Sequence, residues 1–496
     1  MTEHDYVVVG AGSAGCAVAA RLSEDPGSRV LLLEAGPRDR AKEIRIPAAF
    51  SKLFKSKFDW SYQTAPQEGL GGRSIYFPRG KTLGGSSAMN AMMFLPGYPA
   101  DFDGWPDGWS WDDVRPYMEG LEPGSCTVSA LRDPNPMSRA FLEAAAAAEV
   151  EEAALVRVTQ RNGLRCSAAD VYLKPARKRP NLTVVTDAQA LGIDFEGRRA
   201  TGVRHTLPAS PEGRTAHATR EVILCAGAIG SPQLLMTSGV GPAEHLRAHG
   251  IDVVHDLPGV GQNLSDHCMA IALFDAEGSK DSLYTAEKLF QLLRLLLRRR
   301  GMLTSNVGEA AAFVRTRPEL GAPDLELIFA PVLYVEEGLV PPPAHGFSMA
   351  SIALQPGSRG SVSLRSGDPR EAPEISPGYL EDPEDLRVLV EGTKLIRRIA
   401  ATGKLGRWLS GERAPGADVE SDGEIEAWVR QVAQTIYHPV GTCALGNVVD
   451  TELRVNDLES LRVVDASVMP TLNRGHTHAP TTMIAERAAE LIRRAA

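Results

Sequence analysis

The sequence predicts an α/β fold, of the two-domain α+β kind. One domain is expected to contain a parallel Rossmann-like sheet, and the other an antiparallel sheet flanked by helices. The chain opens with an apolar strand at 5–9, a glycine turn, a helix and a second apolar strand at 29–33, which is the order of a dinucleotide-binding unit. Its 496 residues exceed what one hydrophobic core usually supports. Further strand-like runs follow after residue 180, and a long helical pattern follows after residue 380.

The turn after the first strand has the glycine spacing of a dinucleotide-binding loop. Gly10 permits the tight turn, Gly12 lets the backbone approach a pyrophosphate, and Gly15 lets the helix pack closely on the strand. Ser13 and Ala14 begin the helix, whose free N–H groups and positive dipole end face the phosphates. A close-packed turn that binds no ligand is the alternative interpretation.

Glu34 ends the second strand, nineteen residues after Gly15, and Ala35 follows it. An acidic side chain at this position accepts hydrogen bonds from ribose hydroxyls. Because it would repel a 2′-phosphate, the sequence favours FAD or NAD over NADP.

Composition indicates small-molecule chemistry. The net charge of −9 and the isoelectric point near 5.8 leave no broad basic face, so no nucleic-acid partner is expected. The six cysteines lack the spacing of metal ligands, so we expect reduced thiols and no metal site. The first residues lack the charged and apolar regions of a secretory signal, and we therefore expect a cytoplasmic protein.

Residues 288–300 form an apolar stretch with a basic end. The stretch is too short to span a bilayer and has Arg294 in its middle, so no transmembrane segment is expected. We interpret it as an amphipathic helix with one face in the core and solvated arginines at its C-terminal end. Docking on a membrane surface is the alternative.

The middle of the chain predicts strands of both sheets. From 181–186 through two shorter runs to 220–225, apolar runs alternate with turn residues, and we expect a β-meander that returns to the first sheet. The runs 324–330, 348–354 and 361–364 are expected to supply strands of the second sheet.

The last part of the chain predicts two helices and a strand. One helix is expected from about Asp382 to Ala401, and a strand at 461–464 returns to the first sheet. The final helix is expected to begin at Pro480, because proline is favourable at the first helical position.

Two further glycine-rich stretches carry a specific resemblance. Residues 80–103 match, at every defined position, the first signature of the glucose-methanol-choline (GMC) flavin oxidoreductases, and residues 227–241 match the second. The chain resembles this family over nearly its whole length, since the similarity continues at 261–267, 437–442, 464–467 and 478–486.

The resemblance implies FAD and two domains. Residues 1–120, 180–270 and 440–496 would form a discontinuous FAD-binding domain, and residues 121–179 and 271–439 would form the substrate-binding domain and lid.

Met89 stands where some members of the family tether the flavin through a histidine. A thioether cannot form that bond, so we expect non-covalent FAD. Glycine–serine turns present backbone amides to anionic oxygens without steric cost, which suits Gly85 and Asn90 to the pyrophosphate and ribityl chain. By resemblance, further residues lie near the ribityl-phosphate region, the flavin or the adenine: Trp60, Leu83, Ala91, Met92, Met93, Ala190, Tyr437, Asp465 and Ala466.

His438 is the expected catalytic base. An alcohol must lose its hydroxyl proton as its carbon gives a hydride to flavin N5, and imidazole titrates closest to neutral pH. The resemblance places His438 beside the reactive face of the flavin and gives His478 the second catalytic position, while His476 stands where many relatives carry asparagine. A buried structural histidine, or a helix cap for His478, is the alternative.

Phe94, Phe329 and Tyr334 are the candidate substrate contacts, and their aromatic surfaces suit an apolar or aryl alcohol. Ordinary core packing is the alternative for each of them. Glu309 could meet a cationic substrate, although a lone acid on a strand is usually solvated or paired.

The expected function is oxidation of a primary or secondary alcohol to an aldehyde or ketone, with electrons passed to a quinone-like acceptor, a dye or O2. The segment between Tyr117 and Arg165 is shorter than in many relatives, which favours an open site and a dehydrogenase with slow oxidase activity. A hydroxynitrile lyase of the same family is the alternative. Light-driven decarboxylation of fatty acids is least favoured, because those relatives lack the second catalytic residue, supplied here by His478.

Overall fold

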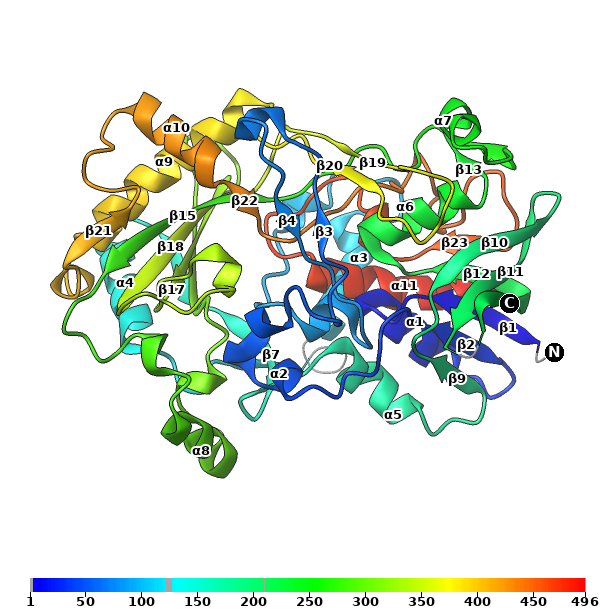
Figure 1. Cartoon of the computed structure of the whole chain (residues 1–496), viewed down its shortest axis with the longest axis horizontal. Coiled ribbons are helices and arrows are strands. Elements are labelled where there is room, and N and C mark those ends of the chain that lie inside the picture. Colours follow the sequence, from blue (N-terminus) through cyan, green and yellow to red (C-terminus); the bar gives the residue numbers. More distant parts are fainter. Residues whose placement is uncertain (1–2, 122–126, 209, 496) are drawn as a thin grey trace.

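The protein folds around two seven-stranded sheets, which lie toward opposite ends of its long axis (Figure 1). The structure is a computed structural model and describes residues 3–121, 127–208 and 210–495. The core of one sheet is parallel, and the other sheet is antiparallel. The predicted α/β fold with a Rossmann-like domain is therefore confirmed.

The first sheet has the strand order β10-β11-β12-β1-β2-β9, with β23 beside β12. Its central strands are buried on both faces, which explains why they read as continuous apolar runs in the sequence. The strands are β1 (His4–Val9), β2 (Val30–Leu33), β9 (Leu182–Val185), β10 (Ala190–Glu196), β11 (Arg199–Leu207), β12 (Ser210–Leu224) and β23 (Leu461–Val463).

The expected meander is wrong at its first strand. The run 181–186 becomes β9, which pairs in parallel with β2 at the far edge of the sheet. The meander consists of β10, β11 and β12, and the end of β12 continues in parallel beside β1. Apolar runs predict a strand but not its partner, because every partner offers the same backbone groups.

Helices α1 (Ser13–Leu22) and α11 (His478–Ala495) pack against each other beside the first sheet. Nε of Arg21 lies 2.7 Å from Oε2 of Glu486 and joins the two helices. Helix α11 begins at His478, two residues before the expected Pro480. A proline is tolerated inside the first turn because the first four N–H groups of a helix have no intrahelical partner.

The second sheet has the order β21-β15-β18-β17-β16-β6, with β22 beside β15. Helices α4 (Pro136–Ala147), α9 (Pro383–Ala400) and α10 (Asp422–Val432) pack on it, and each is capped by a polar side chain. The strands are β6 (Glu152–Leu155), β15 (Cys268–Asp275), β16 (Ala310–Val314), β17 (Leu325–Ala330), β18 (Gly346–Ala353), β21 (Gly411–Ala414) and β22 (Gln434–Thr435).

The run 361–364 is a strand, but it lies outside the second sheet, contrary to the prediction. It forms β19 (Ser361–Ser363), which pairs with β20 (Glu374–Ser376) in a separate hairpin. The smaller elements are α2 (Lys42–Arg45), α3 (Trp111–Gly120), α5 (Lys174–Ala176), α6 (Gly227–Thr237), α7 (Ala243–Ala248), β3 (Tyr62–Gln63), β4 (Tyr76–Phe77), β5 (Val128–Ala130), β7 (Arg157–Arg161), β8 (Leu164–Arg165), β13 (Val240–Gly241) and β14 (His255–Asp256).

Helix α8 (Leu289–Arg298) projects from the body of the molecule below the second sheet (Figure 1). The helix is present, as predicted, but its apolar face is exposed and does not lie in the core. Across the described ranges of the chain, no helix combines the length and apolarity needed to cross a bilayer.

Candidate active site

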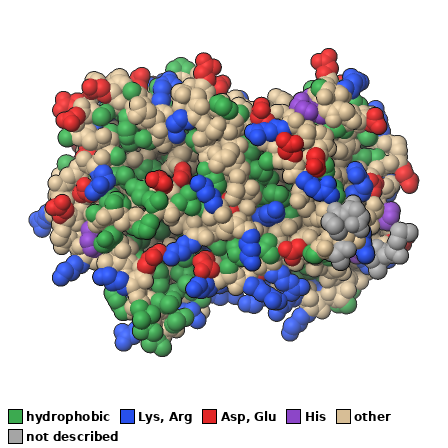
Figure 2. All heavy atoms as spheres, in the orientation of Figure 1, with side chains coloured by type: hydrophobic (Ala, Val, Ile, Leu, Met, Phe, Trp, Pro, Cys, Tyr) green, Lys and Arg blue, Asp and Glu red, His purple; other side chains and the backbone are tan. Residues whose placement is uncertain are grey.

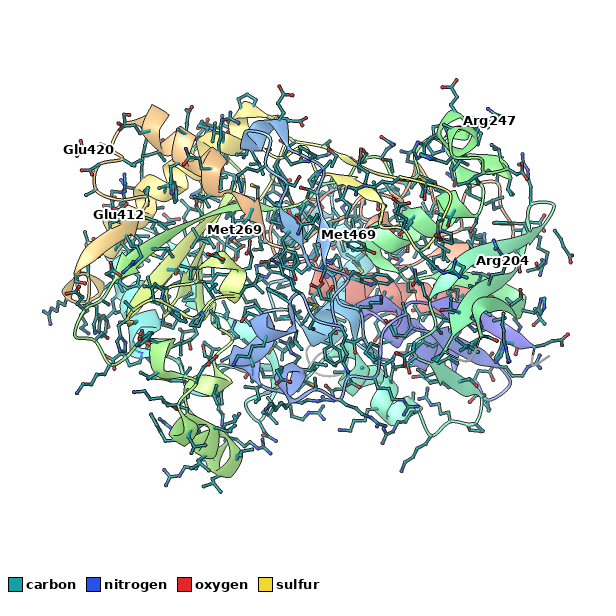
Figure 3. The ribbon with its side chains drawn as sticks, viewed as in Figure 1. Arg204, Arg247, Met269, Glu412, Glu420 and Met469 are labelled. Atoms are coloured by element: carbon teal, nitrogen blue, oxygen red, sulfur yellow. The ribbon has the colours of Figure 1, made fainter. Side chains whose placement is uncertain are left out.

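A cavity of about 370 Å³ reaches from the first sheet to the second. Its walls come from the glycine loop after β1, from residues 85–93, from β15, β17 and β18, and from residues 436–439 and 476–478. Figure 3 places Met269, near the start of β15, at the inner end of the second sheet. His438 and His478 both line this cavity.

Two glycines of the loop leave no room for a side chain. Gly10 has a φ of +97°, and a Cβ atom there would lie 2.6 Å from the carbonyl oxygen of Cys225. A Cβ atom at Gly15 would lie 1.9 Å from the carbonyl oxygen of Gly10, so Gly15 serves the packing of α1. The loop residues that line the cavity are Gly10, Gly12, Ser13 and Ala14.

Glu34 lies buried at the end of β2 beside Ala35, and both line the cavity. Its two carboxylate oxygens accept hydrogen bonds from the N–H groups of Ala11 and Gly36, at 2.9 and 2.8 Å. Burial raises the pKa of Glu34 to about 7, against the lowering effect of these two bonds. Because each carboxylate oxygen has a further lone pair, Glu34 can also accept a hydroxyl from a nucleotide in the cavity.

Asp465, which lines the cavity, joins two segments of the chain. Its carboxylate accepts hydrogen bonds from Ser231 Oγ at 2.6 Å, Gly227 N–H at 2.8 Å and Ser467 N–H at 2.8 Å. Burial raises the pKa of Asp465. The second glycine-rich stretch, which forms α6, is thereby tied to the strand-end segment after β23.

Asn90 is held by a buried arginine that the sequence analysis did not single out. Oδ1 of Asn90 accepts from Arg165 Nη1 at 2.7 Å and from the N–H of Met92 at 3.0 Å. Burial lowers the pKa of Arg165 to about 9. Arg165 ends a short β-hairpin that contains two other arginines, so a single sequence does not distinguish it.

His438 forms a hydrogen-bonded pair with His267. Their Nδ1 atoms lie 3.0 Å apart, and Nε2 of His267 lies 3.1 Å from the carbonyl oxygen of Leu354. Burial lowers the pKa of His267 to about 3, so this imidazole is neutral at physiological pH and carries one proton. Since a carbonyl oxygen only accepts, that proton lies on Nε2 of His267.

The tautomer of His438 follows from this assignment. With Nδ1 of His267 unprotonated, Nδ1 of His438 must donate the hydrogen bond between the rings. Burial lowers the pKa of His438 well below 6.5. The neutral ring therefore presents Nε2 as an unprotonated nitrogen on a side chain that lines the cavity.

The backbone fixes this histidine pair. β15 and β22 pair at Cys268 and Thr435, which brings the segments that carry the two imidazoles side by side. Oδ1 of the buried Asp266 accepts from the N–H of His438 at 2.7 Å, and its Oδ2 accepts from Thr435 Oγ1. Tyr437 adopts a φ of +72°, a strained conformation for an aromatic residue that this network maintains.

His476, and not His478, lies beside His438. The ring centroids of His476 and His438 are 4.5 Å apart, and Nε2 of His476 lies 3.2 Å from Oε1 of the buried Glu326. Nδ1 of His478 instead lies 3.0 Å from Oγ of Ser13, at the start of α1. His478 is the first residue of α11, whereas His476 precedes the helix and faces the second sheet. The second catalytic position of His478 stays a prediction, since His438, His476 and His478 all line the cavity.

Comparison with known proteins identifies the family. Two family models described as GMC oxidoreductase match residues 4–269 and 356–485, which is more than half of the chain. This chain belongs to the GMC oxidoreductase family. The resemblance found in the sequence motifs is confirmed.

Relatives of this GMC oxidoreductase match it end to end. An uncharacterized GMC-type oxidoreductase from Mycobacterium tuberculosis is 48% identical and the alignment covers 99% of both chains. An alcohol dehydrogenase (acceptor) from Pseudomonas putida is 42% identical, with 99% of this chain and 95% of the relative covered. The crystal structure of pyridoxine 4-oxidase from Mesorbium loti superposes with a TM-score of 0.89, 32% identity and coverage of 98% of this chain and 99% of that chain.

The cofactor of this GMC oxidoreductase is FAD. The cavity fits such a group, since it begins at a glycine-rich loop and helix N-terminus and reaches His438 at its other end. Of the remaining expected contacts, Leu83 does not line the cavity, and the following residues do: Trp60, Gly85, Asn90, Ala91, Met92, Met93, Ala190, Tyr437, Asp465 and Ala466.

The substrate end of the cavity is an aliphatic wall that the sequence analysis missed. Alternate residues of neighbouring antiparallel strands share one face of the second sheet, with Ile271 and Ile328 both opposite Ala350. Met269 and Ile436 extend this wall. Side chains along a strand point alternately to its two faces, so this alternation is the sequence signal that could have indicated which residues share the wall.

Two of the predicted substrate contacts lie elsewhere. Phe329 is fully buried and stacks on Phe141 with centroids 5.1 Å apart, because neighbouring residues of a strand point to opposite faces and Ile328 faces the cavity. Phe94 packs in the core of the first sheet. Tyr334 does line the cavity, and its hydroxyl donates to the carbonyl of Glu337 at 2.8 Å.

Glu309 is paired and is no receptor for a cation. Its carboxylate accepts from Ser305 Oγ, Ser138 Oγ and the N–H of Asn135 at 2.6 to 2.8 Å. The group is buried, and burial raises its pKa.

Proposed function

We propose that this chain oxidises an uncharged, apolar primary or secondary alcohol to the aldehyde or ketone, with Nε2 of His438 accepting the hydroxyl proton. The supporting observation is the hydrogen-bond chain from Leu354 through His267 to His438, which leaves that nitrogen unprotonated. The depressed pKa of His438 keeps it in this form at neutral pH. FAD, when bound, accepts the hydride that leaves the carbinol carbon.

His476 is the proposed second group. Its Nε2–H donates to Glu326, whose carboxylate is fully buried. This bond orients the imidazole beside His438, next to the place proposed for the substrate hydroxyl.

His478 has a different proposed role. It begins α11 and hydrogen-bonds Ser13 at the start of α1, so two helix N-termini meet at this part of the cavity. Helix N-termini attract negative charge. We place His478 at the cofactor and not at the substrate oxygen.

The aliphatic wall supports an apolar substrate. Met269, Ile271, Ile328 and Ile436 offer contact area but no charge. Among the described residues that line the cavity, the carboxylates are Glu34 and Asp465, which lie at the nucleotide side. A quaternary ammonium substrate would therefore meet no counter-charge beside His438.

A quinone-like molecule or dye is the proposed electron acceptor, with O2 as a slow alternative. The alignments with the relatives from M. tuberculosis and P. putida run over 529 and 527 positions, against 496 residues here, which is consistent with a chain shortened by deletions. A shorter covering segment would leave the site more open.

Anaerobic reduction of the bound flavin by a panel of alcohols tests this function. We expect medium-chain aliphatic and aryl alcohols to bleach the yellow enzyme, while choline does so far more slowly. A hydroxynitrile lyase would instead release aldehyde and cyanide from a cyanohydrin without bleaching. If no alcohol bleaches the flavin while a cyanohydrin is cleaved, the proposed function is wrong.

A further inference from the structure

Helix α8 is attached to the protein by its polar side. Gln291 and Leu295 are its only buried residues, and Arg294 Nη2 lies 3.0 Å from Oδ2 of Asp133 on the body. Gly301, directly after the helix, donates its N–H to the same carboxylate at 2.9 Å. The remaining apolar side chains of the helix consequently turn outward, the reverse of the usual arrangement on a globular protein.

The outward face is the main exposed apolar surface in the described part of the chain. Every large hydrophobic side chain found exposed there lies in residues 284–297, with Leu289 71% and Leu297 80% exposed. Figure 2 shows these hydrophobic side chains gathered over α8. The side chains that form this surface are Tyr284, Leu289, Phe290, Leu292, Leu293, Leu296 and Leu297. Such a patch marks a binding surface.

The charge around this face is opposite to that of the whole protein. Residues 287–300 contain five basic residues and one acid, although the chain has a net charge of −9. Arg298 and Arg300 are exposed, and no ion pair is found for either within the described residues. Figure 2 shows further Lys and Arg side chains along the same lower edge, over the region of α2 and α5 in Figure 1.

We propose that α8 docks this protein on the surface of an anionic phospholipid bilayer, with its leucines in the acyl region and its arginines at the phosphates. The helix has 10 residues, so it is about 15 Å long and lies in the interface without spanning it. A helix face about 15 Å long and about 10 Å wide covers roughly 150 Å², whereas each partner of a stable dimer buries roughly 800 Å². The face is therefore too small to hold a dimer together by itself.

Docking would bring the cavity close to the lipid. The segments before and after α8 belong to an apolar cluster that contains Leu283, Ala286 and Met302. The same cluster contains Ala330 and Tyr334, which line the cavity. An apolar substrate or a lipid-soluble quinone could thus reach the site from the bilayer.

Vesicle flotation of the full-length holoenzyme tests the proposal. We expect binding to vesicles that contain equal parts of phosphatidylglycerol and phosphatidylcholine, weakening as salt is raised. Leu293→Glu with Leu297→Glu should reduce binding by at least about 100-fold, since two leucines no longer enter the acyl region. Arg298→Ala with Arg300→Ala should weaken binding to the anionic vesicles by about 25-fold, roughly fivefold per charge.

Arg247→Glu is the matched control, because it changes the net charge by the same two units as the leucine pair and lies on α7, across the molecule from α8 (Figure 3). It should float like the wild type. Equal FAD content and dye-linked turnover in all variants would show that they are folded. Binding by the leucine variant at the wild-type level, or no wild-type binding at all, would overturn the proposal. So would a wild-type dimer in lipid-free solution that the leucine substitutions dissociate, since α8 would then bind a second copy.

Discussion

Nδ1 of His267 lies 3.0 Å from Nδ1 of His438, and this contact decides which nitrogen of His438 can take a proton. Leu354 fixes the proton of His267 on Nε2, and His267 in turn fixes the proton of His438 on Nδ1. The free nitrogen of His438 is therefore Nε2. A general base must be correctly placed and must have an unprotonated nitrogen free to accept a proton. The hydrogen bond from His267 Nε2 to the carbonyl of Leu354 meets the second requirement, because it fixes the tautomers of both histidines.

His267→Phe should slow flavin reduction by the alcohol about 10-fold to 100-fold while FAD content stays at the wild-type level. Phenylalanine keeps the ring volume but accepts no hydrogen bond from Nδ1 of His438, so the reactive tautomer is no longer fixed. His267→Asn is the matched variant, because its amide oxygen can still accept. Anaerobic rapid mixing measures both rates. Equal rates in the two variants would show that His267 only fills space.

The pH dependence of flavin reduction tests the charge state of His438. Burial holds the pKa of its imidazole well below 6.5. A lowered pKa keeps the base unprotonated until the pH falls below 6.5, so the rate should remain level from neutral pH down to that value and decline only below it. An acid limb with its midpoint at or above 6.5, seen in kcat/KM, would contradict this account.

His476→Ala should lower the rate of flavin reduction more than His478→Ala does. His476 lies beside His438, whereas His478 is bonded to Ser13 at the cofactor side. We expect His476→Asn to be the milder change at its position, because an amide can still hydrogen-bond the substrate oxygen. His478→Ala should chiefly raise the FAD dissociation constant. The reverse pattern of rate losses would restore His478 to the second catalytic position.

FAD should be released by acid precipitation of the protein. Met89 is buried at the cavity wall, and its thioether offers no atom for a bond to the flavin. We expect the yellow cofactor in the supernatant at one equivalent per chain. Yellow colour that remains on the washed pellet would show a covalent link.

The sequence predicts well those features that depend on local chemistry. A Cβ atom at Gly10 or Gly15 would lie 2.6 or 1.9 Å from a backbone oxygen, so only glycine fits at either position. The spacing of these glycines in the sequence therefore indicates the loop. Glu34 is recognised by its place at the end of an apolar strand. These features need no knowledge of a distant partner.

Features that depend on tertiary packing could not be predicted in this way. His267 stands next to Asp266 in a motif that resembles the family, but its contact with His438 arises only when β15 and β22 pair. His476 and His478 are two residues apart, and the start of α11 decides which of them faces His438. For Phe329, the sequence does not show which face of β17 points to the cavity; the structure places Ile328 on that face and Phe329 on the other.

Anaerobic rapid mixing of His438→Ala with the best alcohol substrate tests the central claim most directly. The wild-type enzyme should be reduced in one fast phase, and the variant should be slower by roughly 10²-fold to 10⁴-fold, the usual contribution of a positioned acid–base group. Its FAD content should be unchanged, since the glycine loop, Glu34 and Asp465 hold the cofactor side of the cavity. Reduction of the variant at the wild-type rate would show that another group removes the proton.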